Sequence, residues 1–146
     1  MTELEFALNT FYLLMSGALV MWMAAGFTML EAGLVRSKNA SEIVTKNLGL
    51  FSIACVMYLT CGFFIMYPGD SAISSWIPGF SFSYLSLGMS SQDMSYGSYS
   101  EASDFFFQVV FVATAMSIVS GAVAERMKLL PFFAFAVILT GFIYPV

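Results

Sequence analysis

Histidine is absent from this 146-residue chain, and charged side chains are scarce. Charged residues make up 10% of the sequence, whereas about 25% is typical of soluble domains. Without histidine the chain lacks the commonest general base, and its serine, cysteine and carboxylate residues form no phosphate-binding loop or metal-ligand spacing. We therefore expect no enzymatic activity, no metal, no other cofactor and no nucleic-acid partner.

Cysteine is also rare, and the two cysteines lie in one apolar run. Cys55 and Cys61 are six positions apart. At that spacing they project from different sides of a helix, so they cannot form a disulfide within it. We interpret both as small apolar packing residues.

Hydrophobic residues account for 60% of the chain and gather in four long runs. Each run is about as long as the roughly 20 helical residues that cross a hydrocarbon core about 30 Å thick. A soluble helical bundle would need polar stripes at helical spacing, but these runs are apolar nearly all round. The sequence predicts an all-α membrane protein with four transmembrane helices. The expected spans are residues 4–34, 42–67, 104–126 and 129–146, with an outer loop at 68–103.

The five basic residues lie in or beside only two of the connections between the spans. Arg36, Lys38 and Lys46 follow the first span, and Arg126 and Lys128 follow the third. Basic connections face the cytoplasm in membrane proteins. This pattern predicts a multi-pass protein of the cell membrane with its amino terminus outside.

Two acidic residues, Glu31 and Glu125, fall near the cytoplasmic ends of predicted spans. An ionisable group at membrane depth is costly unless it is paired or hydrated, so each is a candidate functional residue. We interpret both as structural intramembrane charges. Glu31 could pair with Arg36, with Lys38 or with a group on a neighbouring helix. A role in conduction is the alternative.

A dense group of phenylalanines opens the third span. Phe107 and Phe111 are four positions apart and share one helix face, with Gln108 beside them. Aromatic residues at this spacing usually pack against protein or lipid. An aromatic face can also attract a cation that sheds its water. From the pattern alone, both interpretations stay open.

Two segments resemble the ammonium transporter family, which includes the methylammonium permeases and is related to the Rhesus proteins. Residues 26–39 (GFTMLEAGLVRSKN) are similar to the end of the family's first helix and the following loop, and residues 107–126 (FQVVFVATAMSIVSGAVAER) are similar to its third helix. The order, the spacing and the predicted orientation also fit, apart from the loop at 70–103. The resemblance implies the amino-terminal third of an eleven-helix fold. It also implies a homotrimer whose subunits each conduct ammonium or ammonia through a hydrophobic pore.

The resemblance further implies a role for the phenylalanines. Phe111 would be one of two stacked rings that close the outer mouth of the pore, with Phe107 one turn above it and Gln108 adjacent. The family's other pore groups, including its paired histidines, belong to later parts of the family pattern. We therefore expect residues 1–146 to be part of a longer transporter, surrounded by lipid and by the remaining helices. An ammonium-sensing input module and a small four-span assembly protein are the alternative functions.

Overall fold

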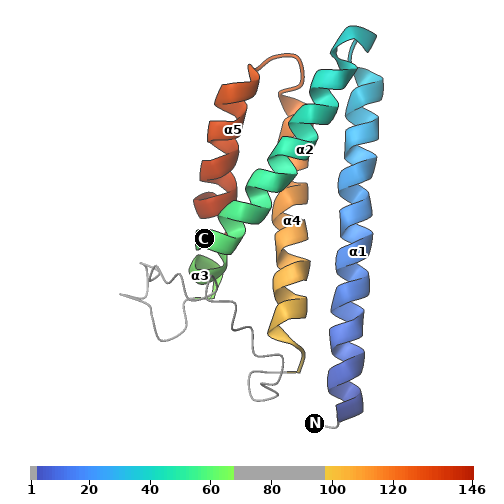
Figure 1. The fold of residues 1–146 in the computed structure, drawn as a ribbon, viewed down its shortest axis with the longest axis vertical. Coiled ribbons are helices and arrows are strands. Elements are labelled where there is room, and N and C mark those ends of the chain that lie inside the picture. The colour runs from blue at the N-terminus through green and yellow to red at the C-terminus, as the bar shows by residue number, and fades with distance from the viewer. Residues whose placement is uncertain (1–2, 68–97) are drawn as a thin grey trace.

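The computed structural model describes residues 3–67 and 98–146, and each element in these ranges is helical. Most of the predicted outer loop, residues 68–97, lies outside the described part of the chain. The α-helices are, in order, α1 (Glu3–Leu34), α2 (Ala40–Met57), α3 (Phe63–Met66), α4 (Glu101–Ala122) and α5 (Leu129–Ile138). Helices α1 and α4 lie side by side, α2 crosses α4, and α5 packs beside α2 (Figure 1).

Short segments of tighter or wider helix continue these elements. A 3₁₀ turn at Ser37–Asn39 leads into α2. One π turn at Tyr58–Gly62 joins α2 to α3, and a second at Leu139–Ile143 follows α5. The two π turns contact each other.

Three helical stretches are long and apolar enough to cross a membrane: Glu3–Leu34, Ser37–Met66 and Glu101–Ala122. The fourth apolar helix, Leu129–Ile143, is shorter. By the helical rise it is roughly 22 Å long, less than the hydrocarbon core. The described fold thus has four continuous helical stretches, with α2 and α3 in one of them, and three of the four have the length of a full membrane span.

Apolar side chains between the helices form two clusters. One includes Tyr58 and Phe63 against Val110 of α4, and the other includes Leu50 of α2 against Phe132 of α5. Small residues bring helix backbones together where lipid provides little hydrophobic driving force. The two clusters hold α2, α4 and α5 together.

The glycines of the two π turns lie where helices approach closely. An added Cβ at Gly62 would lie 2.6 Å from the ring of Tyr58 and 3.2 Å from Pro145. At Gly141 it would lie 2.8 Å from Met57. The Cys61 thiol of the first π turn also contacts Gly141, with its sulfur 3.7 Å from the carbonyl oxygen of that glycine. Both Cys55 and Cys61 are free thiols.

A leucine at Gly62 tests this close packing. Gly62→Leu should lower the free energy of unfolding by about 1–3 kcal/mol, because overpacking forces neighbouring side chains and backbone to shift. Gly26→Leu is the matched control, since an added Cβ there meets no atom within 4 Å. Thermal unfolding in detergent would compare the two. Equal stability of both variants would contradict the close contact between the π turns.

Candidate functional site

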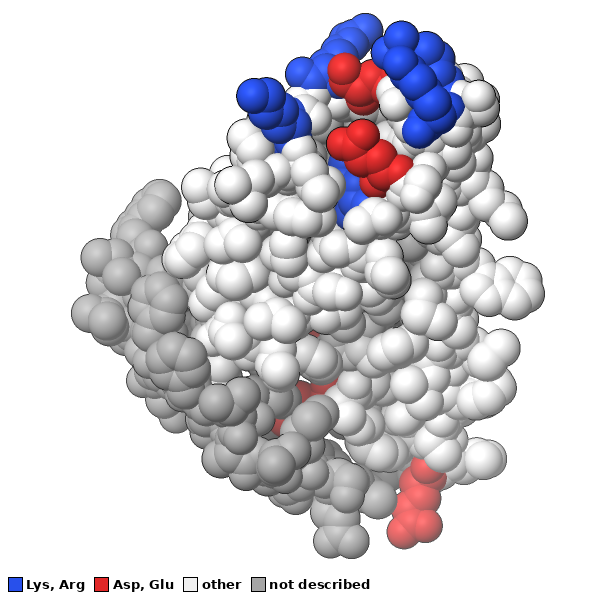
Figure 2. All heavy atoms as spheres, turned by 45° about the horizontal axis from the view of Figure 1, so that its top comes forward, with Lys and Arg blue, Asp and Glu red and all other residues white. Residues whose placement is uncertain are grey.

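Charge divides the molecule into a basic end and an acidic end. All five Lys and Arg residues lie in or beside the α1–α2 and α4–α5 connections, which we call the basic end. Figure 2 shows these side chains gathered at one end of the surface. The first turns of α1 and α4 lie at the opposite end and carry acidic residues. They are Glu3, Glu5, Glu101 and Asp104.

A buried carboxylate lies inside the basic end. Glu31 of α1 is 3% exposed and Lys46 of α2 is 6% exposed. Their charged atoms, Glu31 Oε2 and Lys46 Nζ, are 3.5 Å apart. The same oxygen accepts hydrogen bonds from Ser120 Oγ at 2.9 Å and from Asn47 Nδ2 at 3.2 Å. One carboxylate oxygen therefore joins α1, α2 and α4.

Lys46 has further partners that compensate for its removal from water. Its Nζ donates to the carbonyl oxygen of Ser120 at 3.1 Å. It also lies 5.1 Å from the ring centroid of Phe132 on α5, within the range of a cation–π interaction. A buried ion pair is tolerated when added hydrogen bonds of this kind satisfy its members. The network thus extends to α5.

The partners of Glu31 differ from its nearest candidates in sequence. Arg36 and Lys38 do not pair with it among the described contacts, and the neighbouring helix α2 supplies Lys46 instead. Sequence reasoning missed Lys46, Asn47 and Ser120 as members of the site. A signal was present, because Lys46 lies inside the predicted span 42–67, at a depth comparable to that of Glu31 on the preceding antiparallel helix.

Glu125 lies outside the helix in which the sequence placed it. Helix α4 ends at Ala122, and Glu125 adopts a left-handed backbone conformation with φ of 58° in the turn beyond. This conformation is uncommon for a residue other than glycine and breaks the helical path. Glu125 is therefore an exposed residue of the α4–α5 connection, three positions beyond the end of α4.

The Glu125 carboxylate joins those two connections. Its Oε1 accepts from Asn39 Nδ2 at 2.7 Å, from the Arg36 backbone N–H at 3.2 Å and from Arg36 Nε at 3.4 Å. The Asn39 hydrogen bond, followed by those from Arg36, holds the pKa of Glu125 below its ordinary value. A lowered carboxyl pKa means that these bonds contribute stability above the ordinary pKa and are lost as the pH falls through the lowered one.

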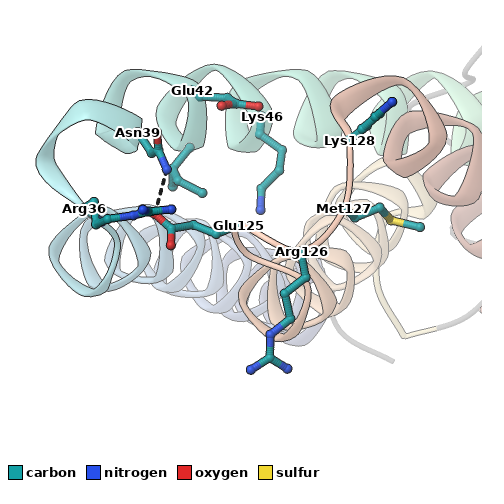
Figure 3. A pocket seen from close by; sticks show the side chains of 9 residues that line it. Arg36, Asn39, Glu42, Lys46, Glu125, Arg126, Met127 and Lys128 are labelled. Carbon is teal, nitrogen blue, oxygen red and sulfur yellow. Dashed lines mark hydrogen bonds and ion pairs between the residues drawn. The ribbon is translucent and has the colours of Figure 1, made fainter.

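A cavity of about 270 Å³ opens between the two connections. Figure 3 shows Lys46 reaching from α2 toward this space, opposite Glu125. Arg36, Asn39 and Lys128 also line it. Lys46 therefore belongs both to the buried ion pair and to the wall of a cavity at the basic end.

The aromatic group at the acidic end of α4 divides into two parts. Phe107 and Phe111 pair with each other, their ring centroids 4.8 Å apart and their planes at 58°. Phe105 instead packs against Tyr58 and Phe63, at 5.6 and 5.5 Å. The gate that the family resemblance implies concerns only the first pair, Phe107 and Phe111.

Gln108 lies next to that pair but turns toward another helix. Its Nε2 donates to the Tyr67 hydroxyl at 3.4 Å. Tyr67 follows the last turn of α3. Gln108 thus connects the start of α4 to the end of α3 beside the phenylalanine pair.

A double-mutant cycle tests the buried ion pair. Glu31→Gln and Lys46→Met should each lower the free energy of unfolding by about 3–5 kcal/mol, because each leaves its partner charge buried and unpaired. The double variant should be more stable than either single variant, since it removes both charges. Thermal unfolding in detergent would measure this. Additive losses in the double variant would mean that the two charges do not interact.

Comparison with known sequences gives the chain its family. The sequence profile described as Ammonium Transporter Family matches residues 11–146. The chain is 37% identical over 150 residues to the ammonium transporter Amt2 of Methanocaldococcus jannaschii, covering 99% of this chain and 33% of that protein. It is 33% identical over 142 residues to Amt2 of Archaeoglobus fulgidus, covering 97% of this chain and 28% of that protein. It is 37% identical over 140 residues to ammonium transporter 1 member 3 of Solanum lycopersicum, covering 96% of this chain and 28% of that protein.

The match covers nearly all of this chain but only part of each relative. The chain spans a third or less of the length of these curated relatives. The family is one of transporters, not of enzymes. A profile match over nearly the whole chain, together with these relatives, confirms the resemblance seen in residues 26–39 and 107–126: the chain belongs to the ammonium transporter family.

Proposed function

We propose that this chain supplies helices for the passage of ammonium or ammonia across the cell membrane. The observation that supports this is the family match over residues 11–146, shared with relatives named as ammonium transporters. Because the chain spans a third or less of those relatives, we propose that conduction also needs further helices. The assembly proposed is a homotrimer with about eleven helices and one hydrophobic pore in each subunit.

The proposed orientation places the basic end in the cytoplasm and the amino terminus outside. The gathering of all Lys and Arg side chains at one end of the bundle supports it (Figure 2), because basic connections remain on the cytoplasmic side. In this arrangement Leu129–Ile143 is the fourth membrane crossing. The acidic first turns of α1 and α4 then face the outside, where carboxylates raise the local concentration of a cation.

The proposed outer gate is the pair Phe107 and Phe111, with Gln108 adjacent. By the helical rise the two rings lie about 9 and 15 Å from the start of α4, so they are inside the outer part of the bilayer. Paired rings exclude water, and their faces can stabilise a cation that has lost part of its hydration shell. Their contact at 4.8 Å supports a joint role.

Single cysteines would test the orientation. In a background with Cys55 and Cys61 replaced by alanine, Ser37→Cys should react with an impermeant thiol reagent only from the cytoplasmic side. Glu3→Cys should react from the outside. Both parent residues are exposed, so the cysteines are open to reagent. Reaction of both variants from the outside of intact cells would disprove the proposed topology.

Uptake of ammonium or methylammonium would test the gate. Phe111→Ala should lower transport per folded molecule roughly tenfold, a barrier change of about 1.4 kcal/mol, because water enters the gap left by the ring. Phe135→Ala, which removes a ring that is 36% exposed on α5, is the matched control and should transport like the parent.

The comparison must be made in the full transporter, with the further helices proposed above, at equal membrane abundance and in cells without other ammonium transporters. Phe105→Ala serves as a second control, since its loss should reduce abundance through the contacts with Tyr58 and Phe63. Unchanged uptake in Phe111→Ala would remove the gate assignment alone. A full transporter that carries this chain unchanged and shows no uptake would disprove the transport function itself.

A further inference from the structure

Two buried oxygen atoms in the ion-pair network accept no hydrogen bond from the described residues. They are Glu31 Oε1 and Asn47 Oδ1. Both residues are more than nine-tenths buried, at 3% and 5% exposure. A buried acceptor without a donor loses the hydrogen bonds that it had in water, so native structures nearly always supply one.

The imbalance between the two carboxylate oxygens of Glu31 is pronounced. Oε2 has Lys46, Asn47 and Ser120 as partners, within 3.5 Å. An ionised carboxylate has about four acceptor positions spread over both oxygens. The described residues therefore leave the acceptor positions on Oε1 without a donor.

A glycine lies beside Oε1. An added Cβ at Gly121 would lie 3.6 Å from Glu31 Oε1, at ordinary van der Waals distance. Asn47 lines a second cavity, of about 410 Å³, between α1 and α2. Lys46 lines the cavity of about 270 Å³ at the basic end. A water molecule needs only about 10–15 Å³ of such space and two to four polar partners.

Charge selects among the small molecules that could donate hydrogen bonds here. The charges of Glu31 and Lys46 cancel, so a cation on Oε1 would leave an uncompensated positive charge inside the bundle. An anion would meet two acceptor oxygens and be repelled. A neutral donor avoids both costs, and water is a neutral donor small enough for such a site.

We propose that Glu31 Oε1 and Asn47 Oδ1 are water-binding atoms, supplied from the cavity that Lys46 lines. The ion pair is then hydrated at membrane depth from the basic end of the bundle. This inference goes beyond the proposed transport function and does not depend on it.

Cysteine reactivity would measure this hydration. Thiols react with methanethiosulfonates as thiolates, which form in contact with water and not in an apolar interior. The probe is Ser120→Cys, with Cys55 and Cys61 replaced by alanine. The control is Thr114→Cys, buried at 1% like Ser120 at 0%, on the same helix. By the helical rise it lies about 9 Å deeper.

The protein should be labelled in its own membrane, made permeable so that reagent reaches both sides. We expect Ser120→Cys to react roughly tenfold or more faster than Thr114→Cys, because only its thiol ionises in contact with water. Equally slow reaction of the two would overturn the proposal. An experimental density map of the unsubstituted protein avoids any effect of the substitutions on folding. Water within about 3.2 Å of Glu31 Oε1 would support the proposal. A side-chain donor, a cation or no density at that position would overturn it.

Discussion

A carboxylate and an ammonium group inside a helical bundle at membrane depth must find each other, because neither can be left unpaired without a large cost. In this chain the pair is Glu31 and Lys46. Helix α1 depends on it most, since the only other residues that α1 buries are Gly17 and Ala24. Apolar contacts alone would let such a helix slide or rotate against its neighbours. Glu31 accepts directional hydrogen bonds from Asn47 of α2 and Ser120 of α4, and these fix the position of α1 along and around its axis.

Further contacts hold α4 in place at both of its ends. At the basic end, Glu125 joins the α1–α2 connection to the α4–α5 connection through Arg36 and Asn39. At the other end, the aromatic contacts of Phe105 hold the start of α4 against Tyr58 and Phe63. With both ends of α4 held, the face that carries Phe107 and Phe111 has a defined direction. This is how a structural ion pair can position a proposed gate that it does not touch.

The sequence located the helices because membrane spans are long apolar runs, which can be recognised without knowing the packing. It also identified the family, through residues 26–39 and 107–126. It could not identify Lys46 as the partner of Glu31, because pairing depends on the crossing of α1 and α2 and not on distance along the chain. The sequence also did not predict that α4 ends at Ala122. That end goes with the left-handed backbone of Glu125 and with its hydrogen bonds to Arg36 and Asn39, which lie 86 to 89 positions away in the chain. The gate stays a prediction, because its function requires the whole pore.

The central claim is that Glu31 and Lys46 pair inside the bundle and set the position of α1. The most direct measurement is an experimental structure of the protein in lipid that resolves both side chains. The account predicts Lys46 Nζ and Ser120 Oγ within about 3.5 Å of one Glu31 carboxylate oxygen, and α1 packed along α4. A Glu31 side chain that reaches Arg36 or Lys38 at the surface, with Lys46 turned away, would contradict it.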